Sequence, residues 1–218
     1  MKNQKFLNIG CGTTILPKPF INIDGRDLEG VDLVCDLKKL PFDNCNFDLI
    51  YCSHVLEHFK RNQCETVLSE WFRCLKKGGI FRISVPDFSS LTKIYSIDND
   101  LEKIIGPLLG GQDYVTNFHY SAFDYISLKA LLEKIGLESI HKWNPRRTCH
   151  SNFWDFSQAQ TNEIPISLNL QGYKPDNILN SKTQSVMKKI EEKLIHSGDQ
   201  SEKFLNEVEN FLESIPEY

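Results

Sequence analysis

The segment KFLNIGCGTT, residues 5–14, decides the fold class, because a short apolar strand leads directly into two closely spaced glycines. Glycine has no Cβ, so Gly10 and Gly12 accept positive φ angles and leave backbone N–H groups uncovered at close range. In α/β proteins, a strand that ends in such a turn brings the backbone close to a nucleotide-like ligand. A G-x-G turn also occurs in many loops, so this interpretation depends on the segments that follow.

Two further apolar segments end in carboxylates. Residues 20–24 read FINID and residues 31–36 read VDLVCD, which places Asp24 and Asp36 at the ends of two predicted strands. In doubly wound sheets, the acid at the tip of the second strand commonly accepts hydrogen bonds from ribose hydroxyls. We therefore predict that Asp24 binds a ribose and that Asp36, beside Leu37, accepts a hydrogen bond from an adenine amine. The alternative is that both acids simply cap strand ends.

Five motifs in a fixed order make a family resemblance specific. They are L-N-I-G-C-G, N-I-D, C-D-L, F-D-L-I-Y-C-S-H-V-L-E-H and L-K-K-G-G-I-F-R-I-S-V-P-D. Their order resembles that of class I S-adenosylmethionine-dependent methyltransferases, and the resemblance extends over residues 5–172. Within that class the chain is most similar to a small bacterial branch associated with surface-polysaccharide synthesis. The resemblance implies a doubly wound, Rossmann-like α/β fold with a mostly parallel seven-stranded sheet and an antiparallel edge hairpin.

The resemblance also implies S-adenosylmethionine as the cofactor and S-adenosylhomocysteine as the product. The residues that match the cofactor motifs are Asn8, Gly10, Cys11, Gly12, Asp24, Gly25, Asp36, Leu37, Ser53 and His54. The family often has an acid at position 8, so either the neutral amide of Asn8 or the backbone would contact the amino group of the cofactor. The interval from Gly12 to Asp24 is short and contains two prolines, which predicts that the first helix is a stub.

Histidines are the candidates for proton transfer. Methyl transfer from a sulfonium mainly requires alignment, but a hydroxyl acceptor also needs a base that is poised near neutral pH. The resemblance places His119 at the rim that faces the cofactor, so we predict that His119 is the base or an acceptor contact and that His58 faces the acceptor. The alternative for each is a structural histidine.

The predicted acceptor-binding residues are Tyr120, Arg146, Arg147 and Trp154. Guanidinium groups bind phosphate bidentately, so the two arginines suit a phosphorylated or nucleotide-linked sugar. The alternative is that they are solvated loop arginines. The acceptor is therefore predicted to be a small molecule, most plausibly a sugar in surface-glycan synthesis.

Two other classes of function stay open. Residues 54–58 read HVLEH, which fits the H-x-x-E-H pattern of a zinc protease, with two histidines on one helical face and the glutamate as base. A protease would need a third ligand downstream and both histidines well inside a helix, whereas this pair directly follows a predicted strand. We therefore predict no metal site. The other class is a non-catalytic module that binds S-adenosylmethionine, which Asn8 and the short first helix would suit.

Composition limits the partners and the location. The 218 residues are 40% hydrophobic and 25% charged, as in an ordinary globular protein, and the net charge of −4 argues against a nucleic-acid substrate. No apolar segment approaches the ~20 residues of a membrane span, and there is no apolar signal region, so we expect a cytoplasmic protein. The seven cysteines form no C-x-x-C pair, which favours free thiols in a reducing compartment.

Apolar periodicity predicts the remaining elements. Helices are predicted over residues 62–77, ended by Gly78 and Gly79, and over 124–135, with Gly136 just beyond the end. Residues 137–143 and 163–170 are predicted as the last two strands, with a long loop between them.

The composition changes near residue 176. We predict a methyltransferase domain over residues 1–175 and a helical extension over 176–218. The extension shows two amphipathic patterns, which would pack on the domain, close over it as a lid, or form a homodimer contact.

Overall fold

The computed structural model describes residues 4–146 and 153–176. The chain divides into two units, residues 1–176 and 177–218, and the described residues all belong to the first. The predicted C-terminal helices and their homodimer contact lie outside the described residues, as does Arg147.

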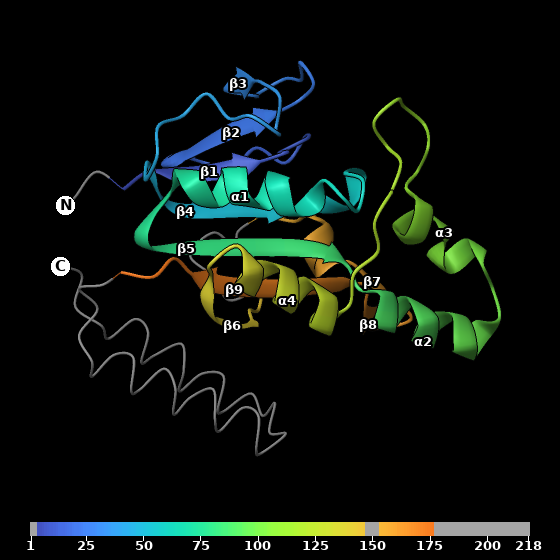
Figure 1. Ribbon diagram of the computed structural model, residues 1–218. Helices are drawn as coiled ribbons and strands as arrows, with labels where there is room; N and C mark the ends of the chain where they lie inside the picture. The colour runs from blue at the N-terminus through green and yellow to red at the C-terminus, as the bar shows by residue number, and fades with distance from the viewer. Residues whose placement is uncertain (1–3, 147–152, 177–218) are drawn as a thin grey trace. The chain divides into compact units, whose positions relative to one another are not determined.

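A seven-stranded sheet in the order β3-β2-β1-β4-β5-β9-β6 forms the centre of the first unit (Figure 1). Its strands are β1 (Phe6–Ile9), β2 (Phe20–Asp24), β3 (Leu33–Val34), β4 (Phe47–Ser53), β5 (Leu75–Pro86), β6 (Glu138–Lys142) and β9 (Ser167–Tyr173). The first five strands pair in parallel, and β9 is antiparallel to both β5 and β6. The predicted Rossmann-like sheet, mostly parallel with an antiparallel strand near one edge, is confirmed.

Two amphipathic helices, α1 (Cys64–Cys74) and α4 (Tyr125–Lys134), pack on the same face of the sheet (Figure 1). Their buried residues belong to one apolar cluster with the inward side chains of β1, β4 and β5. The first turn of α4 is fixed by Asp124, whose carboxylate accepts a 2.8 Å hydrogen bond from the backbone N–H of Ser127. Gly136 follows α4 with φ of +99°, as predicted for a helix end.

The helix predicted over residues 62–77 ends earlier than expected, so its predicted end at Gly78 and Gly79 was wrong. α1 ends at Cys74, and Leu75 already pairs with Phe47 as the first residue of β5. Leu75 is fully buried in the sheet. Because it pairs with β4, the helix ends before the two glycines. Gly78, with φ of +72°, lies in the stretch where the register between β4 and β5 shifts.

Several short elements were not predicted from the sequence. These are η1 (Leu56–His58), α2 (Phe88–Asp98), α3 (Glu102–Leu109), η2 (Phe156–Gln158) and the pair β7 (Gln160–Thr161) and β8 (Ile164–Pro165). The segment between β1 and β2 was expected to hold only a stub of a helix, and it is irregular throughout. As a result, the loop after β1 is held by hydrogen bonds rather than by a helix that packs on the sheet.

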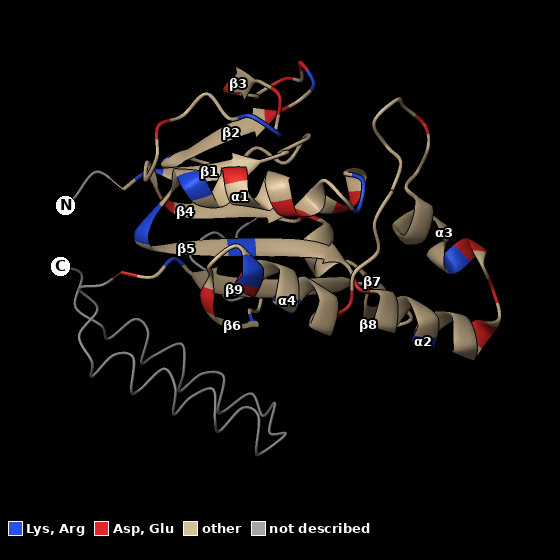
Figure 2. Ribbon diagram, in the orientation of Figure 1, with Lys and Arg blue, Asp and Glu red and all other residues tan. Residues whose placement is uncertain are grey.

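Acidic and basic residues are interspersed along the described elements rather than gathered on one of them (Figure 2). Among residues 4–146 and 153–176, no helix is both long and apolar enough to cross a membrane. The cysteines within these ranges are all free thiols.

Candidate active site

The glycine loop folds over the end of β2. Gly10 and Gly12 have φ angles of +64° and +52°, which favour glycine. The backbone N–H of Cys11 donates to the carbonyl of Ile23 at 3.0 Å, and that of Gly12 donates to Asp24 Oδ2 at 2.8 Å. The predicted loop and the predicted ribose-binding acid are therefore in direct contact.

Gly10 also places this loop against the segment that follows β4. A Cβ atom on Gly10 would lie 2.4 Å from Val55 Cγ2, a distance that no side chain tolerates. Only glycine therefore allows the two loops to approach so closely. The glycine loop and residues 53–58 consequently form one continuous border at the carboxyl ends of β1 and β4.

Asp24 is well placed for a ribose but is already engaged. Its side chain is buried, and Oδ1 accepts hydrogen bonds from the backbone N–H and Nε of Arg26, at 2.9 and 3.2 Å. Two carboxylate oxygens offer about four acceptor sites. Three of them are used, so Oδ2 can still accept a hydrogen bond from one hydroxyl. The Arg26 guanidinium also lies 4.5 Å from the ring centroid of Tyr114, which links the acid to the loop after α3.

The side chain of Asn8 makes its hydrogen bonds inside the fold. Its side chain is 2% exposed, and Nδ2 donates to the carbonyl of Thr14 and to Asn22 Oδ1, each at 3.0 Å. Both Nδ2 hydrogens are thus used to hold the loop after β1. This arrangement favours the backbone alternative for contact with the amino group of a cofactor.

The other predicted adenosine contacts follow β2 and β3. Asp36 is exposed and accepts a 2.9 Å hydrogen bond from the backbone N–H of Lys38. The carbonyl of Leu37 accepts from Trp71 Nε1 at 2.8 Å, which anchors this loop to α1. Gly25 is exposed directly after Asp24, so these residues line the rim one strand away from the glycine loop.

Ser53 and His54 stand where β4 ends. The hydroxyl of Ser53 is buried and has no hydrogen-bond partner among the described residues. His54 has a φ of +53°, and this turn places its Nε2 2.8 Å from Ser167 Oγ and its Nδ1 3.2 Å from Glu57 Oε1. His54 is thereby held between β9 and η1.

Glu57 is a site residue that the sequence analysis considered only as the base of a protease. Its side chain is fully buried, and neither carboxylate oxygen accepts a well-aligned hydrogen bond from a described residue. Burial favours the neutral acid, but the neighbouring histidines, His54 foremost, outweigh it and hold the pKa of Glu57 below its usual value. The only sequence signal for this position was its place in the HVLEH motif.

The structure brings His58 and His119 together, although 60 residues separate them in the chain. Their ring centroids are 4.8 Å apart. His58 Nδ1 lies 3.1 Å from the carbonyl of Phe118, and His119 Nδ1 lies 2.9 Å from that of Pro107. A carbonyl oxygen only accepts, so each Nδ1 bears a hydrogen, and in the neutral form of each ring the lone pair is on Nε2. Burial lowers the pKa of His119, which keeps its ring neutral.

The backbone of Glu57 fixes the relative position of the two histidine segments. Its carbonyl accepts hydrogen bonds from the N–H groups of Tyr120 and Ser121, at 2.8 and 3.2 Å. His119 therefore reaches η1 through its own neighbours in the chain. Tyr120, predicted as an acceptor contact, is 56% exposed at the same rim.

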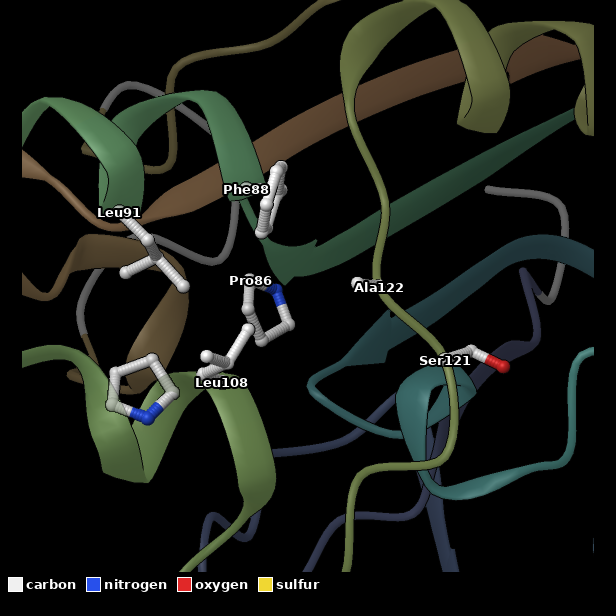
Figure 3. A pocket seen from close by; sticks show the side chains of 7 residues that line it. Pro86, Phe88, Leu91, Leu108, Ser121 and Ala122 are labelled. Carbon is white, nitrogen blue, oxygen red and sulfur yellow. The ribbon is translucent and has the colours of Figure 1, made fainter.

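A small apolar hollow includes Pro107, whose carbonyl lies 2.9 Å from His119 Nδ1 (Figure 3). Its lining is formed by Pro86, Phe88, Leu91, Pro107, Leu108, Ser121 and Ala122. The Ser121 hydroxyl points away from the hollow and donates to the carbonyl of Phe59 at 2.8 Å. The hollow thus offers apolar surface rather than hydrogen-bonding partners.

The remaining predicted acceptor residues, Trp154 and Arg146, lie near η2. Trp154 is 65% exposed and is connected to His54 through Phe156, with ring centroids 5.8 and 5.5 Å apart along this series. Arg146 is exposed and lines a separate hollow that is rich in amide side chains, formed with Asn144, Pro145, Ser157, Gln158, Gln160, Pro165 and Asn169. The structure therefore does not place Arg146 in the group around His58 and His119.

The helical geometry of a zinc protease is absent from residues 54–58. His54 adopts the left-handed conformation before η1 begins, and η1 is a single 3₁₀ turn. The two histidines of the motif consequently do not project from one face of an α-helix, which that catalytic arrangement requires.

The strand order, the glycine loop after β1 and the acid at the end of β2 are typical of the fold of class I S-adenosylmethionine-dependent methyltransferases. The family model described as a methyltransferase domain matches residues 7–83, from β1 into β5. This match and the fold together support an S-adenosylmethionine-dependent methyltransferase. No curated protein matches the sequence.

Solved structures resemble the chain in fold. One is a Thermotoga maritima protein titled a SAM-dependent methyltransferase, possible histamine N-methyltransferase, with 18% identity, TM-score 0.51, and coverage of 78% of this chain and 82% of that one. Another is the Burkholderia thailandensis 1,6-didemethyltoxoflavin-N1-methyltransferase with bound 1,6-didemethyltoxoflavin and S-adenosylhomocysteine. It has 14% identity, TM-score 0.51, and coverage of 79% of this chain and 72% of that one.

Proposed function

We propose that the protein binds S-adenosylmethionine on the rim formed by the glycine loop, Asp24 and Asp36, and transfers its methyl group to a small-molecule acceptor. One observation supports this most directly: Gly12 and Asp24 are hydrogen-bonded to each other, and Gly10 packs against the segment that contains His58. The buried, unpartnered hydroxyl of Ser53 fits the same site, since it lies where β4 ends beside the glycine loop.

When bound, S-adenosylmethionine supplies an activated methyl group on a sulfonium. The chain itself orients the reactants and handles the proton of the acceptor. The free Nε2 lone pair of His119 or His58 is suited to accept a hydroxyl proton, because each ring is fixed through its Nδ1.

For the acceptor we propose a sugar, free or linked to a phosphate or nucleotide, as used in surface-glycan synthesis in the cytoplasm. The exposed ring of Trp154 suits stacking against a sugar, and Arg146 beside several amide side chains suits hydroxyl and phosphate oxygens. The Thermotoga and Burkholderia proteins have titles that name nitrogen acceptors, so an amine on the sugar is the second candidate.

Calorimetric titration with S-adenosylhomocysteine tests the cofactor site. Asp24→Ala removes a charged hydrogen-bond acceptor and should weaken binding by roughly 10- to 100-fold. Asp27→Ala, which removes an exposed carboxylate three residues away, should leave binding unchanged. No detectable binding by the wild-type protein, or equal binding by Asp24→Ala, would contradict the proposal.

Transfer of a labelled methyl group to a panel of sugars, sugar phosphates and nucleotide sugars tests the acceptor. With the best acceptor, His119→Ala should lower the rate by roughly 10²- to 10⁴-fold and leave affinity for S-adenosylhomocysteine unchanged. If only amines that lack a sugar are methylated, the sugar proposal is wrong and the methyltransferase assignment stands.

A further inference from the structure

The buried carboxylate of Glu57 is the least explained group in the described part of the chain. A buried charge is costly unless it is hydrogen-bonded, paired or bound to a metal. The Glu57 side chain has no exposed surface and no well-aligned hydrogen bond, and the nitrogen that approaches it within ion-pair distance is His54 Nδ1 at 3.2 Å. One favourable contact leaves most of the acceptor capacity of the carboxylate unused.

Two imidazoles face this carboxylate. One potential ligand atom from each of Glu57, His58 and His119 lies within 4.8 Å of the other two. Ligand atoms around a single transition-metal ion are typically ~3–4 Å apart, because metal–nitrogen and metal–oxygen bonds are about 2.0–2.2 Å long. A closure of about 1 Å, by small side-chain shifts that keep both Nδ1 hydrogen bonds, would bring all three atoms onto one ion.

The imidazole rings of His58 and His119 have the kind of hydrogen-bond partner that metal-binding histidines usually have. A histidine that binds a metal through one nitrogen usually donates its other N–H to a carbonyl or carboxylate, which fixes the tautomer and the ring orientation. His58 donates in this way to Phe118, and His119 donates to Pro107. His54 in turn contacts Glu57 and is itself held by Ser167, as a support behind a ligating carboxylate would be.

We propose that Glu57, His58 and His119 form a binding site for one divalent transition-metal ion. Two imidazole nitrogens and one carboxylate oxygen suit Mn²⁺, Fe²⁺, Co²⁺ or Zn²⁺ rather than Ca²⁺ or Mg²⁺, which prefer oxygen ligands. Three protein ligands leave coordination positions open, as in sites where a metal holds a substrate. This inference differs from the sequence prediction that the chain has no metal site.

The position of the site gives the ion a role that rests on the proposed function. The ligands line the rim that Gly10 and Val55 join to the glycine loop, so an ion there would face the acceptor. A bound ion orients a hydroxyl and lowers its pKa, and the hydroxyl proton then passes to solvent water. The same Nε2 lone pair cannot also act as a base, so in the metal-bound enzyme the ion replaces the imidazole in this task.

Metal binding is testable without any acceptor. The full-length chain, dialysed against a chelator and then against metal-free buffer, is titrated with Mn²⁺ while free Mn²⁺ is followed by electron paramagnetic resonance. We expect one ion per chain, with an affinity that falls at least tenfold in His119→Ala and in Glu57→Gln. Glu65→Gln, the same change on an exposed face of α1, should bind as the wild type does. Less than half an equivalent in the wild type, or equal affinity in His119→Ala, overturns the proposal.

Two further measurements serve as controls. The Co²⁺ spectrum detects metal bound by cysteines, and thermal unfolding detects variants that do not fold. Co²⁺ should produce visible d–d bands without the intense near-ultraviolet band of thiolate coordination, and these bands should vanish in His119→Ala. Thermal unfolding of metal-free wild type and variants should coincide, and added Mn²⁺ should raise the midpoint only where the site is intact. A thiolate band, or equal stabilisation of His119→Ala, contradicts the site.

Titration of the same metal-free protein with S-adenosylhomocysteine separates this proposal from the proposed function. If the cofactor product binds and the metal does not, the metal site is wrong and the methyltransferase proposal stands. If the metal binds and the cofactor product does not, the metal site stands and the proposed function is wrong.

Discussion

The amides of Asn8 and Asn22 meet across β1 and β2 through a buried hydrogen bond of 3.0 Å from Asn8 Nδ2 to Asn22 Oδ1. Asn22 Oδ1 also accepts from the backbone N–H of Leu16 at 2.9 Å, and its Nδ2 donates to the Leu16 carbonyl at 2.9 Å. Asp32 Oδ2 accepts from Asn22 as well, from the backbone N–H at 2.8 Å and from Nδ2 at 3.2 Å. This network holds the irregular loop after β1 in place.

Asn22→Ala should therefore destabilise the protein far more than an ordinary polar substitution. The change leaves buried groups of Leu16 and Asn8 without partners, and we expect a loss of about 2–3 kcal/mol in the free energy of unfolding. Urea denaturation measures this loss. Asn62→Ala, which removes an exposed amide, should stay within about 0.5 kcal/mol of the wild type. Similar losses for the two variants would show that the network does not stabilise the fold.

The two loop glycines should respond differently to alanine. Both have positive φ angles, which cost an L-residue roughly 1–2 kcal/mol. A Cβ on Gly10 also meets Val55 Cγ2 at 2.4 Å, whereas the nearest group to a Cβ on Gly12 is the flexible end of Arg26 at 3.5 Å. Gly10→Ala should thus destabilise the chain by at least about 1 kcal/mol more than Gly12→Ala in urea denaturation.

A double variant separates the steric clash from the backbone strain. Val55→Ala makes room for the new methyl group, so Gly10→Ala should cost less in that background than in the wild type, with a coupling of about 1 kcal/mol. Gly12→Ala should cost the same in both backgrounds, because its Cβ does not approach Val55. Additive free energies for Gly10→Ala and Val55→Ala would contradict the close packing between the two loops.

Cys11 should be unreactive although it lies in the proposed cofactor loop. Burial first, and the neighbouring Asp24 carboxylate second, raise the pKa of the Cys11 thiol to about 12. At pH 8 only about one molecule in ten thousand then has the reactive thiolate. Alkylation with iodoacetamide followed by peptide mass spectrometry should label the exposed Cys45 well before Cys11. Equal labelling rates would mean that the loop opens in solution.

The sequence predicted the fold best where the local sequence pattern and the long-range contacts favoured the same structure. Residues 20–24 form β2 with the predicted limits, because an apolar alternation there ends in an acid that the glycine loop binds. The end of α1 was misplaced because Gly78 and Gly79 are strong local stop signals, whereas pairing of Leu75 with β4 ends the helix earlier. Strand pairing is a long-range interaction, so the local sequence around residue 75 does not reveal that Leu75 pairs with Phe47.

The candidate site was predictable in its parts but not in its assembly. Gly12, Asp24, His58 and His119 were all identified from motifs. The structure joins Gly12 to Asp24 by a hydrogen bond and brings the rings of His58 and His119 into contact. The role of Glu57 depends on burial without a partner, a property of the packed chain that spacing alone does not contain. The engagement of Asn8 with Asn22 was hidden for the same reason, since the sequence shows two polar residues but not that their strands are neighbours.

Tyr51 offers a test of the opposite face of the sheet, where its hydroxyl donates a hydrogen bond to the carboxylate of Asp155. Burial and then the charge of Asp155 raise the pKa of Tyr51 well above its usual value. In the unfolded chain a tyrosine ionises near pH 10, whereas folded Tyr51 keeps its proton, so the stability that it contributes is full below about pH 10 and falls as the pH rises further.

Tyr51→Phe should therefore be destabilised by about 1–3 kcal/mol at pH 7, because the buried Asp155 loses a hydrogen-bond donor. Urea denaturation at a series of pH values should then show the wild type and the variant converging above about pH 10, since only the wild type gives up this contribution. Tyr120→Phe, which changes an exposed tyrosine, serves as the control and should follow the wild type at every pH. A difference between wild type and Tyr51→Phe that stays constant up to pH values of about 11 would show that Tyr51 ionises as freely in the folded chain as in the unfolded one.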